Sequence, residues 1–315
     1  MAPPVAVQVQ HLHVDDGSAG QRLDNFLLRV LKGVPKTHVY RVIRSGEVRV
    51  NMKRAEAQTK LCLGDSVRVP PVRVAARDNA TTPPREFTVL FEDDLLIAID
   101  KPVGVAVHGG SGVSFGVIEQ LRRARPQSLF LELVHRLDKE TSGVMLIAKK
   151  RSALLNLQDQ FRARGTEKIY AALVNGAWPE RKKVIDVPLL KSLNADGERV
   201  VRANATDGDA KRSITLVKVT QRLPSHTLLD VTIKTGRTHQ IRVHLAHEGA
   251  TIVGDPKYGN FDLNRALGRG PLRFTRMFLH AHKLAFDHPA GGTRMQVLAP
   301  LPAECTLLLQ QLAAA

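Results

Sequence analysis

The chain has few cysteines, and their number and spacing exclude two classes of protein. Cys62 and Cys305 are the only cysteines among 315 residues, and neither belongs to a C-x-x-C pair. Two cysteines so far apart predict neither a disulfide framework nor a zinc ribbon. They fit a reducing compartment, so we expect the protein to be cytoplasmic.

Aromatic residues and long apolar runs are scarce as well. Aromatics make up 4% of the chain, too few for the broad base-stacking surface of a single-strand binding protein. No apolar run approaches the ~20 residues of a membrane-spanning helix. The first ten residues also lack the basic start and apolar core of a signal peptide. We therefore expect no membrane partner.

Acidic residues are in the minority, and the basic excess is concentrated near one end. The chain carries 46 Lys and Arg against 30 Asp and Glu, a formal charge of +16. Between Arg22 and Arg85 there are 14 Lys and Arg against 5 Asp and Glu, a net +9. Such a concentration predicts a polyanionic partner. A turn-rich stretch at 80–84 is typical of a linker. We thus predict an N-terminal tail at 1–18, a small basic module at 19–82 and a larger domain at 83–315.

Within the basic module, apolar spacing predicts two helices and two short strands. The first helix is indicated by apolar residues at i, i+3, i+4, i+7 and i+8, namely Leu23, Phe26, Leu27, Val30 and Leu31. Pro35 opens a second helix that stops before Gly46. Alternating apolar residues at 48–50 and 67–69 predict strands. Several basic residues belong to the second helix and the strand that follows it, namely Lys36, Arg41, Arg44 and Arg49.

The larger domain is predicted to contain many strands and few helices. Helical patterns cover 114–124 and 152–162, and strand-like runs recur at 87–91, 95–99, 169–174, 214–219, 227–233 and 284–286. This arrangement favours an α+β fold with a largely antiparallel sheet. The turn at 101–104 is rigid because it contains Pro102. The polar segment 181–212 has room for a hairpin extension, which periodicity does not settle.

A loop crowded with ionisable and hydroxyl groups, His135 to Gly143, lies between strand-like runs at 129–134 and 144–148. Loops on a rigid sheet often carry catalytic side chains. Asp138 lies between two basic residues, whose charges favour its ionised form. Such a carboxylate can act as a nucleophile, a general base or a metal ligand. On the residues alone, a solvated hairpin whose polar side chains satisfy the turn is the better explanation of the loop.

Two further segments carry groups suited to catalysis. Tyr170 begins a strand, where half-buried packing is more frequent than a catalytic role. Arg237 and Arg242 belong to a short helical run on adjoining turns, and their guanidinium forks suit carboxylate or phosphate. An ordinary surface helix is the alternative there.

Histidines suggest a metal site that their spacing does not support. A metal hydrolase could be assembled on paper from His239, His244, His280, His282 and Asp255. These spacings match no zinc or di-metal motif, so we expect most of these histidines to be packing groups or contacts to the polyanionic partner. The turn at 254–259 is interpreted as structural.

Three stretches resemble known family motifs. The loop from His135 to Gly143 is similar to the H-R-L-D-x-x-T-S-G signature of pseudouridine synthases that act on ribosomal RNA. Residues 236–244 match the pattern G-R-[TS]-H-Q-[IL]-R-x-H of the same family. The pattern from Arg22 through 46–51 to Asp65 resembles the S4-type RNA-binding domain. From about residue 19, the chain resembles the ribosomal large-subunit pseudouridine synthases, and within them the subfamily called C.

The resemblance implies a role for particular residues. Asp138 corresponds to the catalytic aspartate, Tyr170 to the active-site tyrosine and Arg242 to the arginine that pairs with the aspartate, with Arg237 as the alternative. It also implies RNA contacts by two groups of residues, His135, Arg136, Arg237 and His239 in the catalytic domain and Lys36, Arg41, Arg44 and Arg49 in the S4-like module.

The activity implied is isomerisation of uridine to pseudouridine in large-subunit (23S) ribosomal RNA, by a cytoplasmic monomer that binds this RNA or its assembly intermediate. The fold implied is a small α/β S4-like module followed by a mixed, largely antiparallel catalytic domain. The reaction needs neither cofactor nor metal, and the sequence has no P-loop and no G-x-G-x-x-G before a helix. The alternatives are a non-catalytic S4-type RNA-binding or ribosome-assembly factor and a metal-dependent nuclease.

Overall fold

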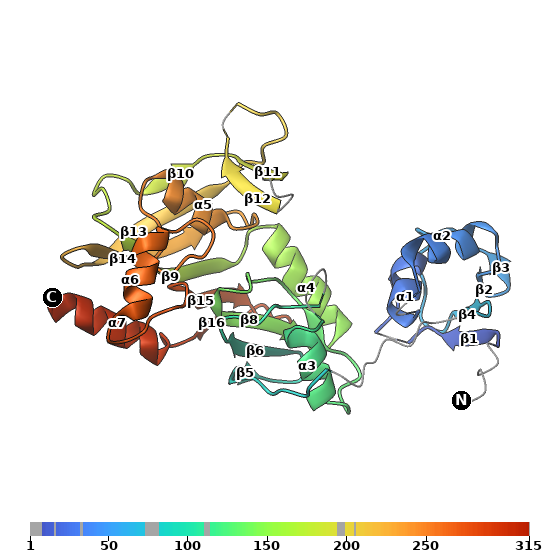
Figure 1. Cartoon of the computed structure of the whole chain (residues 1–315). Coiled ribbons are helices and arrows are strands. Elements are labelled where there is room, and N and C mark those ends of the chain that lie inside the picture. The colour runs from blue at the N-terminus through green and yellow to red at the C-terminus, as the bar shows by residue number, and fades with distance from the viewer. Residues whose placement is uncertain are drawn as a thin grey trace, which may run out of the picture. The chain divides into compact units, whose positions relative to one another are not determined.

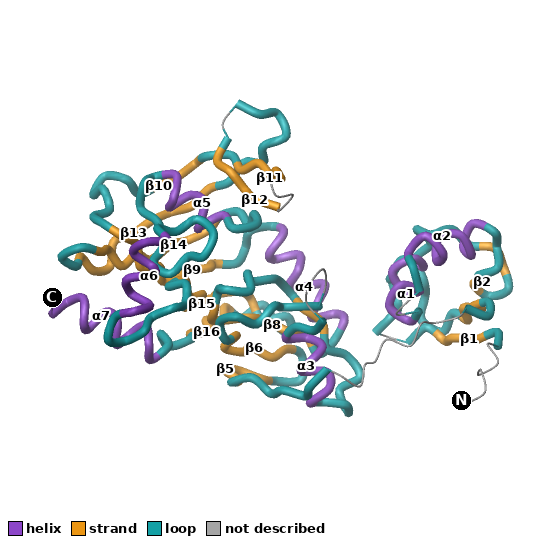
Figure 2. Tube along the Cα trace, in the orientation of Figure 1, coloured by secondary structure: helices purple, strands orange, loops and turns teal. Residues whose placement is uncertain are grey.

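The chain folds as two compact units, Met1–Pro83 and Pro84–Ala315 (Figure 1). The structure is a computed structural model that describes residues 8–15, 17–31, 34–72, 82–109, 114–193, 199–204 and 206–314. Within this part of the chain, no helix is long and apolar enough to cross a membrane. Figure 2 distinguishes the helices from the strands in each unit.

The first unit combines two helices with a four-stranded sheet of order β1-β4-β2-β3. The helices are α1 (Leu23–Val30) and α2 (Lys36–Arg44), and the strands are β1 (Gln10–His13), β2 (Arg49–Val50), β3 (Lys53–Arg54) and β4 (Ser66–Val69). The helix predicted from the apolar spacing is α1, which buries Leu23, Phe26 and Leu27. Both helices and β4 supply one apolar core.

The first strand corrects one expectation. Residues 10–13 fall in the segment predicted to be a tail, but β1 pairs antiparallel with β4 along its whole length. Only one of its four residues is even partly buried. The hydropathy of these four residues therefore does not predict a strand. The strand with which they pair lies more than 50 residues away, so no local pattern indicates it.

The second unit is built on a ten-stranded sheet with mixed α and β content, as predicted. The main path runs β10-β13-β14-β9-β15-β8-β6-β5, with β16 beside β15 and β7 beside β8. Its strands are β5 (Val89–Glu92), β6 (Leu96–Lys101), β7 (Glu132–Leu133), β8 (Ser142–Ala148), β9 (Glu167–Asn175), β10 (Val184–Asp186), β13 (Ile214–Arg222), β14 (His226–Ile233), β15 (Leu279–Asp287) and β16 (Arg294–Leu298). The pairs are antiparallel except β8 with β15, which is parallel.

Helices cover both faces of this sheet. They are α3 (Val117–Ala124), α4 (Arg151–Arg162), α5 (Gln240–His247), α6 (Phe261–Arg269) and α7 (Ala303–Ala314). Alternate residues of a strand point to opposite faces. Accordingly, Ile97 and Ile99 of β6 share a cluster with α3 and α5. Their neighbours Leu96 and Ala98 share one with α4. The segment whose structure periodicity left open holds the hairpin β11 (Leu189–Leu193) and β12 (Arg199–Ala203).

Gly143, at the start of β8, lies at a point of close backbone approach. Its φ is +112°, and a Cβ built there would lie 2.3 Å from the carbonyl oxygen of Ala281 on β15. Both the conformation and the space require glycine. This contact is part of the parallel pairing that anchors the end of the loop carrying Asp138.

We expect Gly143→Ala to lower the free energy of unfolding by about 2 kcal/mol or more, because it forces the two backbones apart and strains φ. Urea denaturation of the variant measures this. Gly291→Ala is the matched control, since nothing lies within 4 Å of its Cβ position. Equal stability of the two variants would contradict the prediction.

Candidate active site

Two adjoining cavities lie where the loop after β7 meets β9, β14 and the start of α5. The larger measures about 710 Å³ and the smaller about 100 Å³. They share Arg136, Asp138, Tyr170, Ile233, Gly236 and Arg237. Arg242 and His239 line the smaller cavity, which we call the chamber. The chamber thus brings together all three residues assigned to catalysis by resemblance.

Asp138 is held on a braced loop. Its side chain is 27% exposed, and its carbonyl accepts a hydrogen bond from the amide of Thr141 at 3.1 Å, closing a turn. The next carbonyl, that of Lys139, accepts from the amide of Gly104 at 2.9 Å and from Nζ of Lys101 at 3.2 Å. Two donors from one turn therefore fix the backbone beside the carboxylate.

Lys101 supports the loop that carries Asp138, a contact that the sequence analysis missed because it interpreted the segment only as a rigid turn. Its side chain is fully buried. Besides Lys139, its Nζ donates to the carbonyls of Pro102 at 2.9 Å and Val105 at 2.8 Å. Burial lowers the pKa of Lys101 to about 7, although attraction by Glu140 and Asp138 opposes the shift. The sequence did contain one indication of a buried lysine, since Lys101 ends an apolar strand.

Arg242 is the guanidinium nearest to Asp138, but its strongest partner is a different carboxylate. Its Nε and Nη2 each donate to an oxygen of Asp255 at 2.7 Å. Its Nη1 lies 3.8 Å from Oδ2 of Asp138 and 4.0 Å from Oε2 of Glu140. Arg237, the alternative, is exposed and makes no ion pair with a described residue; its Nε reaches the carbonyl of Arg212 at 3.5 Å.

Asp255 was interpreted as part of a structural turn, and in the structure it also holds the guanidinium of Arg242. It is completely buried. Burial would raise its pKa, but the hydrogen bonds and charge of Arg242, with the amides of Tyr258 and Lys257, outweigh burial and hold the pKa below the ordinary value. No local pattern marks this role, because the partner is 13 residues away.

His239 caps α5 in the left-handed conformation, with φ 53° and ψ 22°. Strained backbone of this kind concentrates at functional sites. Its Nε2 lies 4.0 Å from Oδ2 of Asp138, and its Nδ1 is 2.9 Å from Oη of Tyr258. Burial lowers the pKa of His239, although the charge of Asp138 opposes the shift. Tyr258 therefore holds the His239 ring on the wall of the chamber.

Tyr170 lies at the start of β9 and is buried. Burial, and then the charge of Asp138, raise the pKa of Tyr170 well above its ordinary value. The residue is consequently a neutral phenol at physiological pH. Its ring and hydroxyl suit stacking and hydrogen-bond donation better than service as a general base.

His135 and Arg136 take different positions although they are adjacent. The ring of His135 stacks on Phe161 with centroids 4.7 Å apart, and its Nε2 accepts from the amide of Leu146 at 3.1 Å. Burial and repulsion from Lys168 lower the pKa of His135 to about 4, so the ring is neutral. It forms part of the wall of the larger cavity, whereas Arg136 is exposed at the mouth shared by both cavities.

Two of the other histidines that suggested a metal, His244 and His280, contact protein groups. His244 contacts the hydroxyl of Thr215 at 2.8 Å and the carbonyl of Val187 at 2.9 Å. His280 contacts Ser142 at 2.8 Å. Across the described ranges, no group of three or more His, Cys, Asp or Glu is arranged to hold a metal ion.

The basic residues singled out in the first unit are all exposed. They are Lys36, Arg41 and Arg44 on α2 and Arg49 on β2. Arg41 lies 3.8 Å from Glu47, and Arg49 donates to the carbonyl of Met52 at 3.4 Å.

Comparison with known proteins defines the class of protein first. The profile of the RNA pseudouridylate synthase family matches residues 95–247, and that of the S4 domain matches residues 21–67. Human RNA Pseudouridylate Synthase Domain Containing 4 has a similar structure, with a TM-score of 0.59 and 26% identity over 71% of this chain and 92% of that chain.

Full-length relatives then narrow the class. Ribosomal large subunit pseudouridine synthase C of Escherichia coli (strain K12) is 48% identical over 301 residues, 93% of both chains. Its namesake in Haemophilus influenzae is 47% identical over 96% of this chain and 95% of that protein. The chain belongs to the RNA pseudouridylate synthase family, and is an RNA pseudouridine synthase with an N-terminal S4 domain.

We expect Asp255→Asn to lower the free energy of unfolding at pH 7 by about 3–5 kcal/mol, because it leaves a buried arginine without its full partner. The folded pKa of Asp255 lies below its unfolded value of about 3.9. Its stabilisation is therefore complete above that value and is lost as the pH falls through the folded pKa. Urea unfolding at pH 7 and down to pH 3 should show the difference from the unmodified chain shrinking below about pH 4. A difference that stays constant with pH would be inconsistent with this role.

Proposed function

We propose that this synthase isomerises particular uridines of large-subunit (23S) ribosomal RNA to pseudouridine, with Asp138 as the catalytic residue. The relatives named for this substrate align over nearly the whole chain. The observation that carries the assignment of the site is the chamber of about 100 Å³, which is lined at once by Asp138, Tyr170 and Arg242.

The reaction rearranges one nucleotide and imports nothing. The C1′–N1 bond breaks, the uracil turns while bound, and C5 bonds to C1′; C5 then loses its proton and N1 gains one. Asp138 either adds to C1′ or removes the proton at C2′. Arg242, 3.8 Å away, orients the carboxylate without a hydrogen bond that would occupy its oxygens.

The chamber is suited to a base that has left its stack. Unstacking a nucleotide costs a few kcal/mol. Tyr170 offers a ring for the detached uracil, and Arg136, at the shared mouth, is positioned to fill the space that the base leaves. The walls therefore compensate for part of the stacking energy of the base.

The larger cavity supplies the phosphate contacts. Six cations line it, namely Arg136, Arg162, Arg164, Lys168, Lys234 and Arg237, and Asp138 is the one carboxylate among its described lining residues. Burial, and then repulsion from Lys234 and Arg164, lower the pKa of Lys168. Cations that repel one another in a cavity are stabilised by a bound polyanion. Neutralising phosphates there offsets the cost of extruding the uridine.

We expect Asp138→Asn to abolish isomerisation, because an isosteric amide is neither nucleophile nor base. Folding and RNA affinity should change little. Release of tritium from RNA labelled at C5 of uridine measures turnover. Asp262→Asn is the matched control, since the side chain of Asp262 is 90% exposed. Measurable turnover by Asp138→Asn would show that Asp138 is not the catalytic residue.

We expect the double change Arg164→Gln and Lys234→Gln to raise KM and to make RNA binding less dependent on salt. For every cation that no longer neutralises a phosphate, the slope of log affinity against log salt should fall by about 0.7–0.9. Binding across a salt series measures the slope, with the exposed Arg265→Gln as control. An unchanged slope would mean that this rim does not contact phosphate.

A further inference from the structure

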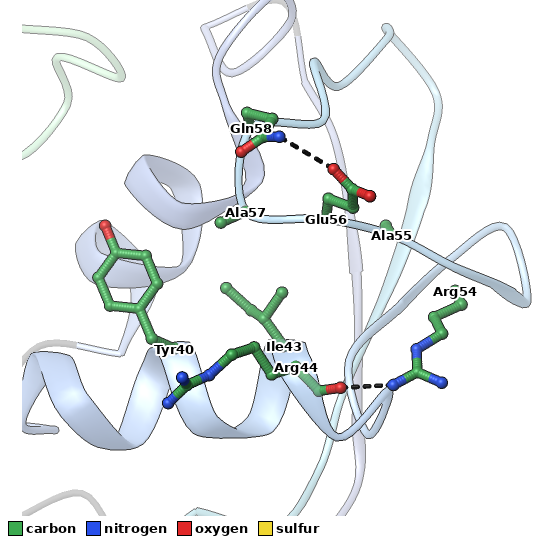
Figure 3. A pocket seen from close by; sticks show the side chains of 8 residues that line it. All are labelled: Tyr40, Ile43, Arg44, Arg54, Ala55, Glu56, Ala57 and Gln58. Atoms are coloured by element: carbon green, nitrogen blue, oxygen red, sulfur yellow. Dashed lines mark hydrogen bonds between the residues drawn. The ribbon is translucent and has the colours of Figure 1, made fainter.

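The first unit contains a pocket that no part of the isomerisation uses. It measures about 550 Å³ and lies between α2 and the segment 54–58 (Figure 3). Its lining residues come from these two segments, namely Tyr40, Ile43, Arg44, Arg54, Ala55, Glu56, Ala57 and Gln58.

One wall of the pocket is an exposed aromatic ring. Tyr40 is 36% exposed, while Ile43 beside it is buried. The chain has three tyrosines, and the other two, Tyr170 and Tyr258, contribute to the active site. In an RNA-binding unit with so few aromatics, a ring presented in a pocket is suited to stack one base.

A buried carboxylate preorganises this wall. Asp24 is 2% exposed, and it accepts hydrogen bonds from Oη of Tyr40 at 3.1 Å and from Nη2 of Arg22 at 2.7 Å. Its amide donates to the carbonyl of Ala57 on the opposite segment at 3.0 Å. Burial would raise the pKa of Asp24, but the hydrogen bond from Arg22, with those from the amide of Asn25 and from Tyr40, holds it below the ordinary value. The pocket is therefore formed before a ligand arrives.

Two guanidinium groups border the pocket with their charges unpaired. Nη2 of Arg54 donates to the carbonyl of Arg44 at the end of α2, which fixes the Arg54 side chain against Gly46. No carboxylate of the described part of the chain pairs with Arg44 or Arg54. The guanidinium of Arg54, held in this way, is a forked donor that fits a phosphate.

The remaining wall presents hydrogen-bond acceptors. Nε2 of Gln58 donates to Oε2 of Glu56 at 2.9 Å, as the dashed line in Figure 3 shows. This bond leaves the amide oxygen of Gln58 and a carboxylate oxygen of Glu56 as acceptors. Acceptors select a base edge that carries an amino group, as cytosine does and uracil does not.

We propose that this pocket binds one unstacked, amino-bearing nucleotide of the RNA substrate, with its base on Tyr40 and its phosphate at Arg44 and Arg54. The proposal rests on the proposed function in that the ligand is the same RNA. It assigns the first unit a contact with a base in addition to contacts with phosphates.

The test compares Tyr40→Phe with Tyr40→Leu in the full chain, because both lose the hydrogen bond to Asp24 and only one loses the ring. With a fluorescent fragment of large-subunit ribosomal RNA, Tyr40→Leu should bind roughly five- to a hundredfold more weakly than Tyr40→Phe. The salt slope should be the same for both, whereas Arg54→Gln should reduce it by about 0.7–0.9. Phe261→Leu and Arg265→Gln, both exposed on α6, should match the unmodified chain.

Three results would overturn the proposal. Equal affinity of Tyr40→Phe and Tyr40→Leu would exclude stacking. Equal competition by C8 and U8 oligonucleotides, instead of a preference for C8 that Glu56→Ala removes, would exclude recognition of the amino group. Tight binding of cytidine monophosphate alone would assign the pocket to a free nucleotide. If the chain formed no pseudouridine, the proposed function would be wrong. The binding comparisons would still show whether the pocket binds a nucleotide.

Discussion

The candidate active site depends on the buried ion pair between Arg242 and Asp255. Both side chains are at most 2% exposed, and removing two charges from water is costly unless the geometry is very good. Here two parallel hydrogen bonds of 2.7 Å meet that condition. Because Asp255 holds two corners of the guanidinium, the third remains 3.8 Å from Asp138. An arginine free to turn would form the bidentate pair with Asp138 itself and occupy the oxygens that the proposed reaction needs.

The backbone beside Asp138, like the guanidinium of Arg242, is held by groups that lie outside the loop. Lys101 and Gly104 hold the carbonyl of Lys139 from one side. Gly143 ends the loop against Ala281 at a distance that no side chain tolerates. A carboxylate must be held to within a fraction of an ångström to react. The loop achieves this because strands on either side of it, β6 and β15, each supply a rigid contact.

Patterns confined to a few neighbouring residues were readable from the sequence, and pairings across the chain were not. The helix face of Leu23 and Phe26 repeats within one turn, so spacing alone predicted α1. The α+β class followed from the number of strands, and the family from contiguous motifs. Asp255, Lys101 and β1 were missed because each is defined by a partner that only the fold supplies. The parallel pairing of β8 with β15 joins residues 138 positions apart, and no local periodicity encodes it.

The chain has a net charge of +16, and the cations that attract a polyanion are those without a carboxylate partner. Away from the cavities, carboxylates neutralise cations: Arg125 pairs with Glu86 and Glu92, and Arg276 with Glu304. Along the larger cavity, Arg162 pairs with its neighbour Asp159, but Arg136, Arg164 and Lys234 have no carboxylate partner among the described residues. Under the proposed function, phosphates are therefore attracted to the larger cavity. The one carboxylate lining that cavity, Asp138, would repel phosphates, and the surrounding cations offset this repulsion. Under the proposed function, the charges that attract the RNA thus keep the carboxylate of Asp138 compatible with a polyanionic substrate.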